Sequence, residues 1–562
     1  MVFAGVFSAL LNLLYLAPTL YMLQVYDRVV PSRGKVTLLL LTLAVLAALG
    51  VLALLDLARS RILVRAGVRL EKQLAAAVLD AGFARVTGPS RDALVNRAMR
   101  DFDVMRQSLT GPAILALFDA PWSPLYILVS FAIHPWLGAL SLAGAVILYG
   151  MAAANEAWTG GRLRTASAAT NNAYLSQQYS AANAEIIRAL GMRQSMVRRH
   201  IAERVSASQL QLAASLTGSN INAASRFVRL GLQSMALGLA AYLAIEQKIS
   251  IGAIFAASLL MGRALSPIEQ LLSAWRGLGQ ARDAYRSLSE ILRQTENAGP
   301  TTSLPRPSGG IQVERLSVSN VGQPGLILND LSFGIARGEV VGVIGPSGAG
   351  KTTLARMLAL ADRPDAGVVR FDGADARQWS QERLAQWIGY MPQQTVLFGG
   401  TIRQNIARFS DLTTSGDEVD AAVLEAARSA GAHDLIVHLP QGYDTVLGWG
   451  GRGLAAGHAQ RIALARALFG APDLLVLDEP NAHLDTEGEA TLATAILDAK
   501  RRGCTVMVIA HRTGVLATVD RLMVMRAGRI ELFGPRDEVI ARMSQPSAGA
   551  PRTPAVRGNT PT

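Results

Sequence analysis

The sequence predicts an all-α domain of six transmembrane helices followed by an α/β domain of the P-loop type. Long runs without Asp, Glu, Lys or Arg occupy the first half, and 50% of the 562 residues are hydrophobic. The second half alternates β-like and helical stretches around a glycine-rich loop. The expected division is a transmembrane domain with long intracellular helices at 1–293, a linker at 294–310, a nucleotide-binding domain at 311–543 and a disordered tail at 544–562.

The first two spans follow from charge-free runs. Residues 2–25 and 36–55 carry no charge, and about 20 apolar residues suffice to cross a bilayer. A signal peptide is the competing interpretation of the first run. Its apolar region would be shorter and preceded by positive charge, so the sequence favours a span.

The remaining spans need a break inside one long run. Residues 120–155 lack Asp, Glu, Lys and Arg and are too many for one helix, and Pro135 disfavours helix at His134. Spans are therefore expected near 108–133 and from Trp136 onward. A fifth fits 230–245, and the sixth should begin at Ile251 and be interrupted at Arg263 and Pro267.

Charge indicates orientation and partners. The net charge of +12 suits either nucleic acid or loops beside anionic lipid. The arginines lie between the apolar runs, in residues 57–107 and 156–229, which favours membrane lipid and argues against nucleic acid. An even number of spans places both stretches on the side of the C-terminal half, as expected for cytoplasmic segments.

The single cysteine, Cys504, excludes a disulfide framework and a cysteine-based metal site within the chain. It begins the apolar run 504–509, which indicates a buried strand residue rather than a nucleophile.

A Walker A loop lies between a predicted strand at 340–344 and a predicted helix at 352–360. Its glycines let backbone N–H groups face phosphates, and the helix N-terminus favours the same anion. Lys351 would meet the β- and γ-phosphates of ATP, and Thr352 would bind Mg²⁺. The nucleotide-binding residues of the loop are Gly345, Pro346, Ser347, Gly348, Ala349, Gly350, Lys351, Thr352 and Thr353.

A matching Walker B strand is expected at 474–480, where four apolar residues lead to two carboxylates. Asp478 would hold Mg²⁺ through water. Glu479 would orient and activate the attacking water as general base.

Three further residues complete the predicted site. His511 follows a third apolar strand and would contact the γ-phosphate. Gln393 begins a loop that would sense Mg²⁺ and touch the membrane part, although the adjacent Gln394 competes for that role. Asp485 would sit at a dimer seam.

The order of these motifs resembles the ATPase domain of ABC transporters, and the resemblance covers nearly the whole chain. Within that family, the segments 21–33, 118–124 with His134 and Pro135, and 184–192 resemble type I secretion exporters, in the subgroup without a peptidase domain before the first span. The resemblance implies an ABC exporter fold and an ATP-hydrolysing subunit of the bacterial inner membrane that exports protein or peptide. It also implies a second ABC subunit, a periplasmic adaptor (membrane fusion) protein and an outer-membrane channel.

Departures from the family pattern affect the expected activity. The family signature Leu-Ser-Gly-Gly-Gln is 454–458 here, with Ala455 for the serine and His458 at its end. In the family, the serine and the second glycine, here Gly457, bind ATP held by the partner subunit. Ala455 cannot donate that bond, which is worth about 1.5–3 kcal/mol. In addition, Trp449 lies where the family usually has an acidic residue.

Asparagine also stands at 320, where the family usually stacks an aromatic ring on adenine. These departures leave two assemblies open: a homodimer that tolerates the altered signature, or a low-activity half of a heterodimer. A lipid or small-molecule exporter, and a regulatory subunit that barely hydrolyses ATP, also remain as alternatives. The span residues Asn12, Gln24, Asp119 and Gln233 either mark a transport pathway or form interhelical hydrogen bonds.

Overall fold

The computed structural model describes residues 2–84, 91–296, 304–320, 325–410, 416–448, 451, 453–510 and 513–544. The chain divides into two compact units. The helical unit comprises Met1–Val86 and Ser90–Asn297, and the α/β unit contains Ala298–Thr562. Part of the expected linker (297–303) and of the expected tail (545–562) lies outside the described residues, so the proposed domain borders stay a prediction.

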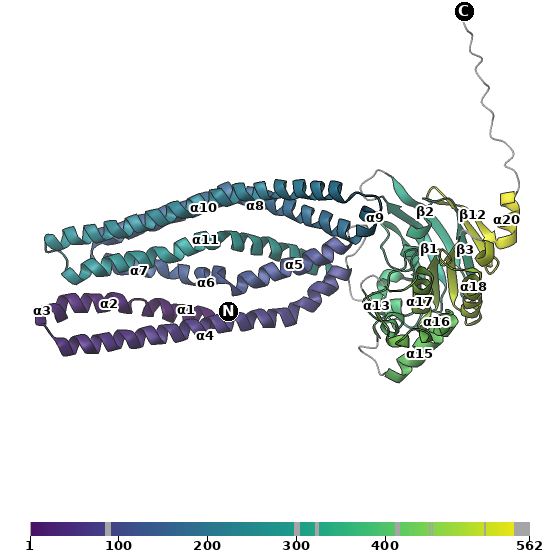
Figure 1. Cartoon of the computed structure of the whole chain (residues 1–562), viewed down its shortest axis with the longest axis horizontal. Helices are drawn as coiled ribbons and strands as arrows, with labels where there is room; N and C mark the ends of the chain where they lie inside the picture. Colours follow the sequence, from purple (N-terminus) through teal and green to yellow (C-terminus); the bar gives the residue numbers. More distant parts are fainter. Residues whose placement is uncertain are drawn as a thin grey trace, which may run out of the picture. The chain divides into compact units, whose positions relative to one another are not determined.

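The helical unit contains long helices, of which α8 and α10 run alongside each other (Figure 1). Its elements are α1 (Val2–Leu14), α2 (Ala17–Gln24), the π-helical turn η1 (Val25–Val29), α3 (Val30–Ser32), α4 (Lys35–Ala84), α5 (Arg91–Thr110), α6 (Pro112–Asp119), the 3-10 turn η2 (Ala120–Trp122), α7 (Ser123–Ile133), α8 (Pro135–Ala182), α9 (Ala184–Ala189), α10 (Arg193–Ile245) and α11 (Ile251–Glu296).

Six helical stretches among the described residues are long and apolar enough to cross a membrane, which confirms the predicted number. They are Phe3–Ser32, Lys35–Phe83, Pro112–Ile133, Pro135–Ala182, Arg193–Ile245 and Ile251–Trp275. Large apolar side chains such as Leu39, Leu40 and Leu43 on α4 point outward. Burial against protein does not account for such a surface, but contact with lipid does.

The predicted break at His134 is confirmed. Its backbone is extended (φ −162°, ψ 139°), and its Nδ1 accepts a hydrogen bond from the Trp136 amide at 3.3 Å. The extended residue ends α7, and the capped amide starts α8.

The predicted interruption of the sixth span is wrong. Helix α11 continues through Pro267. The guanidinium of Arg263 lies 4.0 Å from the centre of the Tyr15 ring, and the neighbouring Ala264 and Leu265 are fully buried. Packing of α11 against neighbouring helices just before the proline offsets the loss of one backbone hydrogen bond, as is common in membrane helices.

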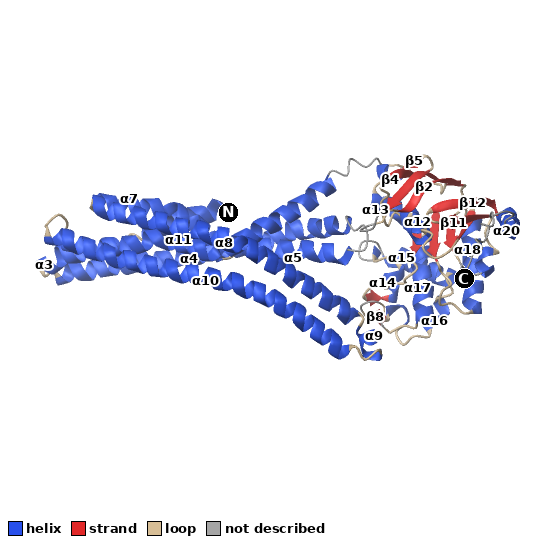
Figure 2. Cartoon of the chain, turned by 90° about the horizontal axis from the view of Figure 1, so that it is seen from above, coloured by secondary structure: helices blue, strands red, loops and turns tan. Residues whose placement is uncertain are grey.

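The α/β unit is built on strands that Figure 2 shows gathered together in red, with helices around them. They are β1 (Ile311–Ser319), β2 (Leu326–Ile335), β3 (Val340–Ile344), β4 (Ala366–Phe371), β5 (Ala374–Asp375), β6 (Ile388–Met391), β7 (Gly400–Thr401), β8 (Val446–Leu447), β9 (Leu474–Asp478), β10 (Thr505–Ile509), β11 (Arg521–Arg526) and β12 (Arg529–Pro535). A six-stranded sheet has the order β12-β11-β3-β10-β9-β6, and an antiparallel four-stranded sheet has the order β2-β1-β4-β5.

The helices of this unit are mostly short. They are α12 (Lys351–Leu358), the 3-10 turn η3 (Ala376–Gln378), α13 (Gln381–Gln386), α14 (Ile402–Ile406), α15 (Gly416–Ser429), α16 (His433–Val437), the 3-10 turn η5 (Gly442–Asp444), α17 (Ala456–Leu468), α18 (Thr486–Arg501), α19 (Thr513–Leu516) and α20 (Arg536–Ser544).

The six-stranded sheet is buried on both faces, which explains why its central strands are continuous apolar runs. One face packs against the four-stranded sheet and α12, through residues such as Val341, Val343, Val476 and Met507. The other face packs against α15, α17 and α18, through residues such as Val340, Leu475, Leu477 and Val508. Cys504 is buried at the start of β10, as predicted.

Residues just before β1 are attached to the α/β unit. Arg306 forms a bidentate ion pair with Asp473, with Nε–Oδ2 at 2.7 Å and Nη2–Oδ1 at 3.1 Å. Ser308 donates its hydroxyl to Asp372 at 2.8 Å. The second half of the expected linker therefore packs on the unit that follows it.

Candidate nucleotide-binding site

The Walker A loop connects β3 to α12, as predicted. Gly345 opens it with φ +151°, and a Cβ at this position would lie 2.2 Å from the Met525 carbonyl oxygen. The loop lies so close to β11 that only glycine fits at this position. Gly350 then precedes α12 with φ +93° and offers no side chain to cap it, so the first-turn amides of α12 are available to an anion.

Lys351 is 6% exposed, and its ammonium lies over the loop. Its Nζ donates to the carbonyl oxygens of Gly345 at 2.8 Å and Pro346 at 3.0 Å. These neutral carbonyls accept two of its three N–H groups and bring no negative charge to the ammonium. Phosphate is the ligand that suits such a charge beside exposed amides.

Three parallel strands bring the predicted catalytic segments to one edge of the sheet. In β10, Ile509 pairs with Val343 of β3 and with Asp478 of β9. The Walker A loop, Asp478 and Glu479 therefore follow strand ends at the same level. His511 lies outside the described residues, although β10, which precedes it, ends at this edge.

Glu479 has a left-handed backbone, with φ +52°. This conformation is unusual for a residue other than glycine, and such strain is often found at functional sites. The amide of Glu479 donates to the Ile509 carbonyl at 3.0 Å, which ties the end of β9 to the end of β10. The sequence predicted a role for Glu479 but gave no signal of its conformation.

Gln393 follows β6, whose Met391 pairs in parallel with Leu477 of β9. Its loop therefore leaves the sheet at the same edge. Gln393 and Gln394 are both exposed, so burial does not separate the two candidates.

Asp485 is exposed and caps α18 by accepting from the Gly488 amide at 2.8 Å. Arg461 of α17 donates to the same oxygen at 3.1 Å. The Gly488 amide, aided by the charge of Arg461, lowers the pKa of Asp485 below its usual value. An exposed carboxylate at this position agrees with the predicted seam without testing it.

The altered signature forms the start of α17. Ala455 is the exposed residue before the helix and provides no side-chain cap. At Gly457 a Cβ would lie 3.2 Å from the His483 carbonyl oxygen, so a larger residue would crowd the segment after β9. Trp449 lies outside the described residues. Asn320 directly follows β1, and its amide donates to the Gly325 carbonyl at 3.0 Å.

Gln460 is a residue of this region that sequence reasoning missed. It is 3% exposed. Its Nε2 donates to the Pro480 carbonyl at 2.5 Å, and its Oε1 accepts from the His483 amide at 3.0 Å. Gln460 therefore fastens α17 to the segment after Glu479. Its spacing from the buried Ala463, Leu464 and Ala467 was the available signal.

The residues present fit a magnesium nucleotide. Thr352 and Asp478 offer a hydroxyl and a carboxylate, the donor types that Mg²⁺ accepts. Within the described residues, no group of three His, Cys, Asp or Glu could hold a metal by itself. Phosphate oxygens and water would then have to complete the coordination, which is the usual arrangement for Mg²⁺.

The helical unit also holds a polar cluster, formed by residues from α1, α4 and α6. Arg59, 5% exposed, donates to Asp119 at 2.9 Å, Asp56 at 2.8 Å and Ser8 at 2.8 Å. Asn12 also donates to Asp119, at 3.0 Å. Of the residues that could mark a pathway, Asn12 and Asp119 are therefore joined by an interhelical hydrogen bond.

Comparisons with known proteins cover both units. The family model for the ABC transporter transmembrane region matches residues 1–267, and the family model for the ABC transporter matches residues 328–482. A bacterial Atm1-family ABC exporter with ATP bound has the same fold, with a TM-score of 0.81 over 96% of each chain and 24% identity.

The chain is 39% identical to the type I secretion system ATP-binding protein PrsD of Rhizobium meliloti (strain 1021), over 96% of this chain and 92% of that protein. It is 32% identical to the cyclolysin secretion/processing ATP-binding protein CyaB of Bordetella pertussis, over 95% and 75% of the two chains. It is 29% identical to the alpha-hemolysin translocation ATP-binding protein HlyB of Escherichia coli O157:H7, over 95% and 76%.

These matches agree with a multi-pass membrane protein that carries one nucleotide-binding domain, and they support ATP hydrolysis coupled to transport. The chain therefore belongs to the ABC transporters of type I secretion systems.

Proposed function

We propose that this chain drives export of a protein or peptide across the bacterial inner membrane, with its α/β unit in the cytoplasm. The observation that carries the proposal is a Walker A loop on the same chain as six membrane-spanning helices, in a sequence 39% identical to a type I secretion protein. An even number of spans would leave the arginine-rich segments on the same side of the membrane as the C-terminal half, and this supports the orientation.

The described residues suggest how ATP is held and cleaved. Lys351 and the amides of the loop bind the phosphates, and Thr352 and Asp478 hold Mg²⁺. The metal neutralises charge on the phosphates when bound. Glu479, held beside β10 by its backbone, orients the attacking water and accepts its proton. Gln393 contacts the nucleotide or its metal, and so does His511, whose role is proposed from the sequence alone.

We further propose that two ABC subunits work together, with Ala455 and Gly457 of one facing ATP bound to the other. A homodimer is favoured, and a heterodimer is the alternative because Ala455 lacks the hydroxyl of the family's serine. The ATPase rate of the purified chain alone decides between them. Turnover by the lone chain supports the homodimer, whereas turnover only with a second subunit supports the heterodimer.

The partners we propose are membrane lipid, a periplasmic adaptor protein, an outer-membrane channel and the exported protein. The names of the relatives, which are secretion and toxin translocation proteins, support this set. Cross-linking of the chain in intact cells, followed by identification of the captured proteins, tests the adaptor and the channel.

The subgroup of exporters that the sequence resembles exports proteins with C-terminal signals. The central experiment therefore measures export of a candidate protein, with and without its C-terminal segment, from cells that carry Glu479→Gln. Glu538→Gln is the matched control, because Glu538 is an exposed carboxylate of the same unit. Export should stop with Glu479→Gln, continue with Glu538→Gln and require the C-terminal segment. Equal export with Glu479→Gln would remove ATP hydrolysis by this chain from the process.

A further inference from the structure

Arg408 lies just after α14 and contacts three separate elements of the α/β unit. Its Nε donates to the Arg466 carbonyl at 3.0 Å, and its Nη2 donates to the Ala467 carbonyl at 3.1 Å. Its Nη1 donates to the carbonyls of Ala385 and Ile388, both at 3.1 Å. One guanidinium therefore joins the last turns of α13 and α17 to the first residue of β6.

Charge suits this arrangement. Carbonyl groups at the C-terminal end of a helix lack partners within the helix and carry partial negative charge. Burial lowers the pKa of Arg408 to about 10, which still leaves the guanidinium charged at neutral pH. The planar fork of arginine can reach several carbonyls at once, which the ammonium of lysine cannot do in the same geometry.

The backbone at this position is strained. Arg408 and Phe409 are consecutive residues other than glycine, with φ of +53° and +58°. Each such conformation is unfavourable and persists only where the surroundings enforce it. Here the Phe409 amide donates to the Gln404 carbonyl at 2.9 Å, and the Phe409 ring packs edge-on against Phe398.

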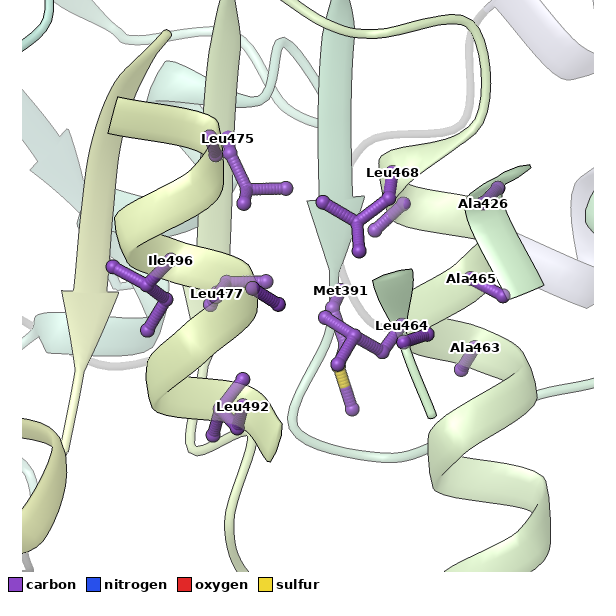
Figure 3. Close-up of a cluster of buried hydrophobic side chains, with 14 of the residues drawn as sticks. Met391, Ala426, Ala463, Leu464, Ala465, Leu468, Leu475, Leu477, Leu492 and Ile496 are labelled. Carbon is purple, nitrogen blue, oxygen red and sulfur yellow. The ribbon is translucent and has the colours of Figure 1, made fainter. Parts of the chain in front are cut away.

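Strand β6 and helix α17 also pack closely through contacts that do not involve Arg408. A Cβ on Gly389 of β6 would lie 2.2 Å from the Ala467 carbonyl oxygen, so only glycine permits the approach of α17. Beyond this point, Met391 of β6 belongs to the same buried cluster as Leu464 and Leu468 of α17, and Figure 3 shows the three side chains close together. The end of α17 and strand β6 therefore form one joint.

The loop that carries Gln393 is attached to this joint at both ends. It leaves β6 at Met391 and reaches Phe398. Asn405, fully buried, donates to the Phe398 carbonyl at 2.9 Å and accepts from the Phe398 amide at 2.8 Å. The guanidinium of Arg466, in the last turns of α17, lies 5.6 Å from the centre of the Phe398 ring.

We propose that Arg408 is a positioning residue for ATP hydrolysis, because it fixes the C-terminal end of α17 to β6 and to the loop that carries Gln393. The signature Ala455–Gly457 lies at the other end of α17. When the signature moves, α17 rotates about this joint, and the rotation shifts the loop that carries Gln393. The inference rests on the proposed roles of Gln393 and the signature.

The test compares Arg408→Met and Arg408→Lys in the full-length chain in lipid, with Arg403→Met as control. Arg403 lies on α14, and its side chain pairs with Asp420. We expect kcat to fall about tenfold in Arg408→Met and less in Arg408→Lys. The Kd for ATP should change less than twofold because Lys351 is untouched. The control should keep its kcat.

Hydrogen exchange gives a readout that does not depend on hydrolysis. Amides of 393–399 and 456–460 should exchange faster in Arg408→Met than in Arg403→Met. Gly389→Ala, which opens the same joint from β6, should give the same pattern and replaces Arg408→Met if that variant does not fold. Unchanged kcat and unchanged exchange would overturn the inference. Normal kcat in Gln393→Ala and Glu479→Gln would instead contradict the proposed site.

Discussion

Each unit buries a positive charge, but the two charges have different partners. Lys351 of the α/β unit is 6% exposed and donates to two neutral carbonyls. Arg59 of the helical unit is 5% exposed and pairs with the carboxylates of Asp56 and Asp119. In the described part of the chain, no carboxylate pairs with Lys351. The charge of Lys351 is therefore available to a ligand, whereas that of Arg59 is used within the protein.

Removal of the charge at Lys351 is expected to have the largest effect. Lys351→Ala should lower ATP hydrolysis about 100-fold or more, because a positioned donor to developing phosphate charge is lost. The unfolding temperature should change little, because water can replace Lys351 as the donor to the carbonyls of Gly345 and Pro346. Lys500→Ala, a lysine of the same unit that pairs with Asp520, is the matched control. Equal loss in both variants would contradict the comparison.

Arg59→Met should lower the stability of the helical unit and leave ATP binding unchanged, the reverse of the effect expected for Lys351→Ala. It leaves the carboxylate of Asp119 inside the bundle without its cation, and loss of one member of a buried pair typically costs about 3–5 kcal/mol. Asp56 is half exposed and should contribute little of this. We expect a lower unfolding temperature in detergent and an unchanged Kd for ATP.

Asp119→Asn in the Arg59→Met background supplies the check on that explanation. Neutralising both members should recover much of the stability, because no buried charge then lacks a partner. If the double variant is as unstable as the sum of the two single variants, the pair contributes no coupling and Arg59 acts through packing alone.

The two charges also differ in how well the sequence predicts them. Lys351 lies in a local motif between one strand and one helix, so its surroundings could be derived from neighbouring residues. The partners of Arg59 lie in other helices: Asp119 is 60 positions away and Ser8 is 51. Contacts of that kind depend on how helices pack, which a hydropathy pattern does not specify. Hydropathy predicted the number of spans and singled out Asp119, but it did not predict the partner of Asp119.

The same distinction holds within each unit. The strand before Lys351 and the strand that ends at Asp478 were predicted to the residue or nearly so. The left-handed Glu479, the buried Gln460 and the four contacts of Arg408 were not predicted. Pro267 was expected to interrupt a span because local rules disfavour proline in a helix, but packing of α11 against its neighbours outweighs that preference.

Asp485 should give a smaller effect that depends on pH. Its folded-state pKa lies below the unfolded-state value, so the contacts to Gly488 and Arg461 contribute fully above the unfolded-state pKa. Their contribution falls as the pH drops through the folded-state pKa. The unfolding temperature of the wild type should therefore exceed that of Asp485→Asn at pH 6, and the difference should shrink toward pH 3. A constant difference would show that ionisation is not involved.

The smallest effect concerns Cys504, which serves as a reporter of the α/β unit because it is the only cysteine of the chain. Burial raises its pKa to about 12 and leaves it 4% exposed, so iodoacetamide should not label it at pH 8 in the folded protein. It should label fully in guanidinium chloride, as the positive control. In Arg59→Met at a temperature where the helical unit has loosened, Cys504 should stay unlabelled if the two units are stabilised separately. If labelling instead rises as the helical unit unfolds, the charge of Arg59 also stabilises the fold around Lys351. The two buried cations would then not have separate roles.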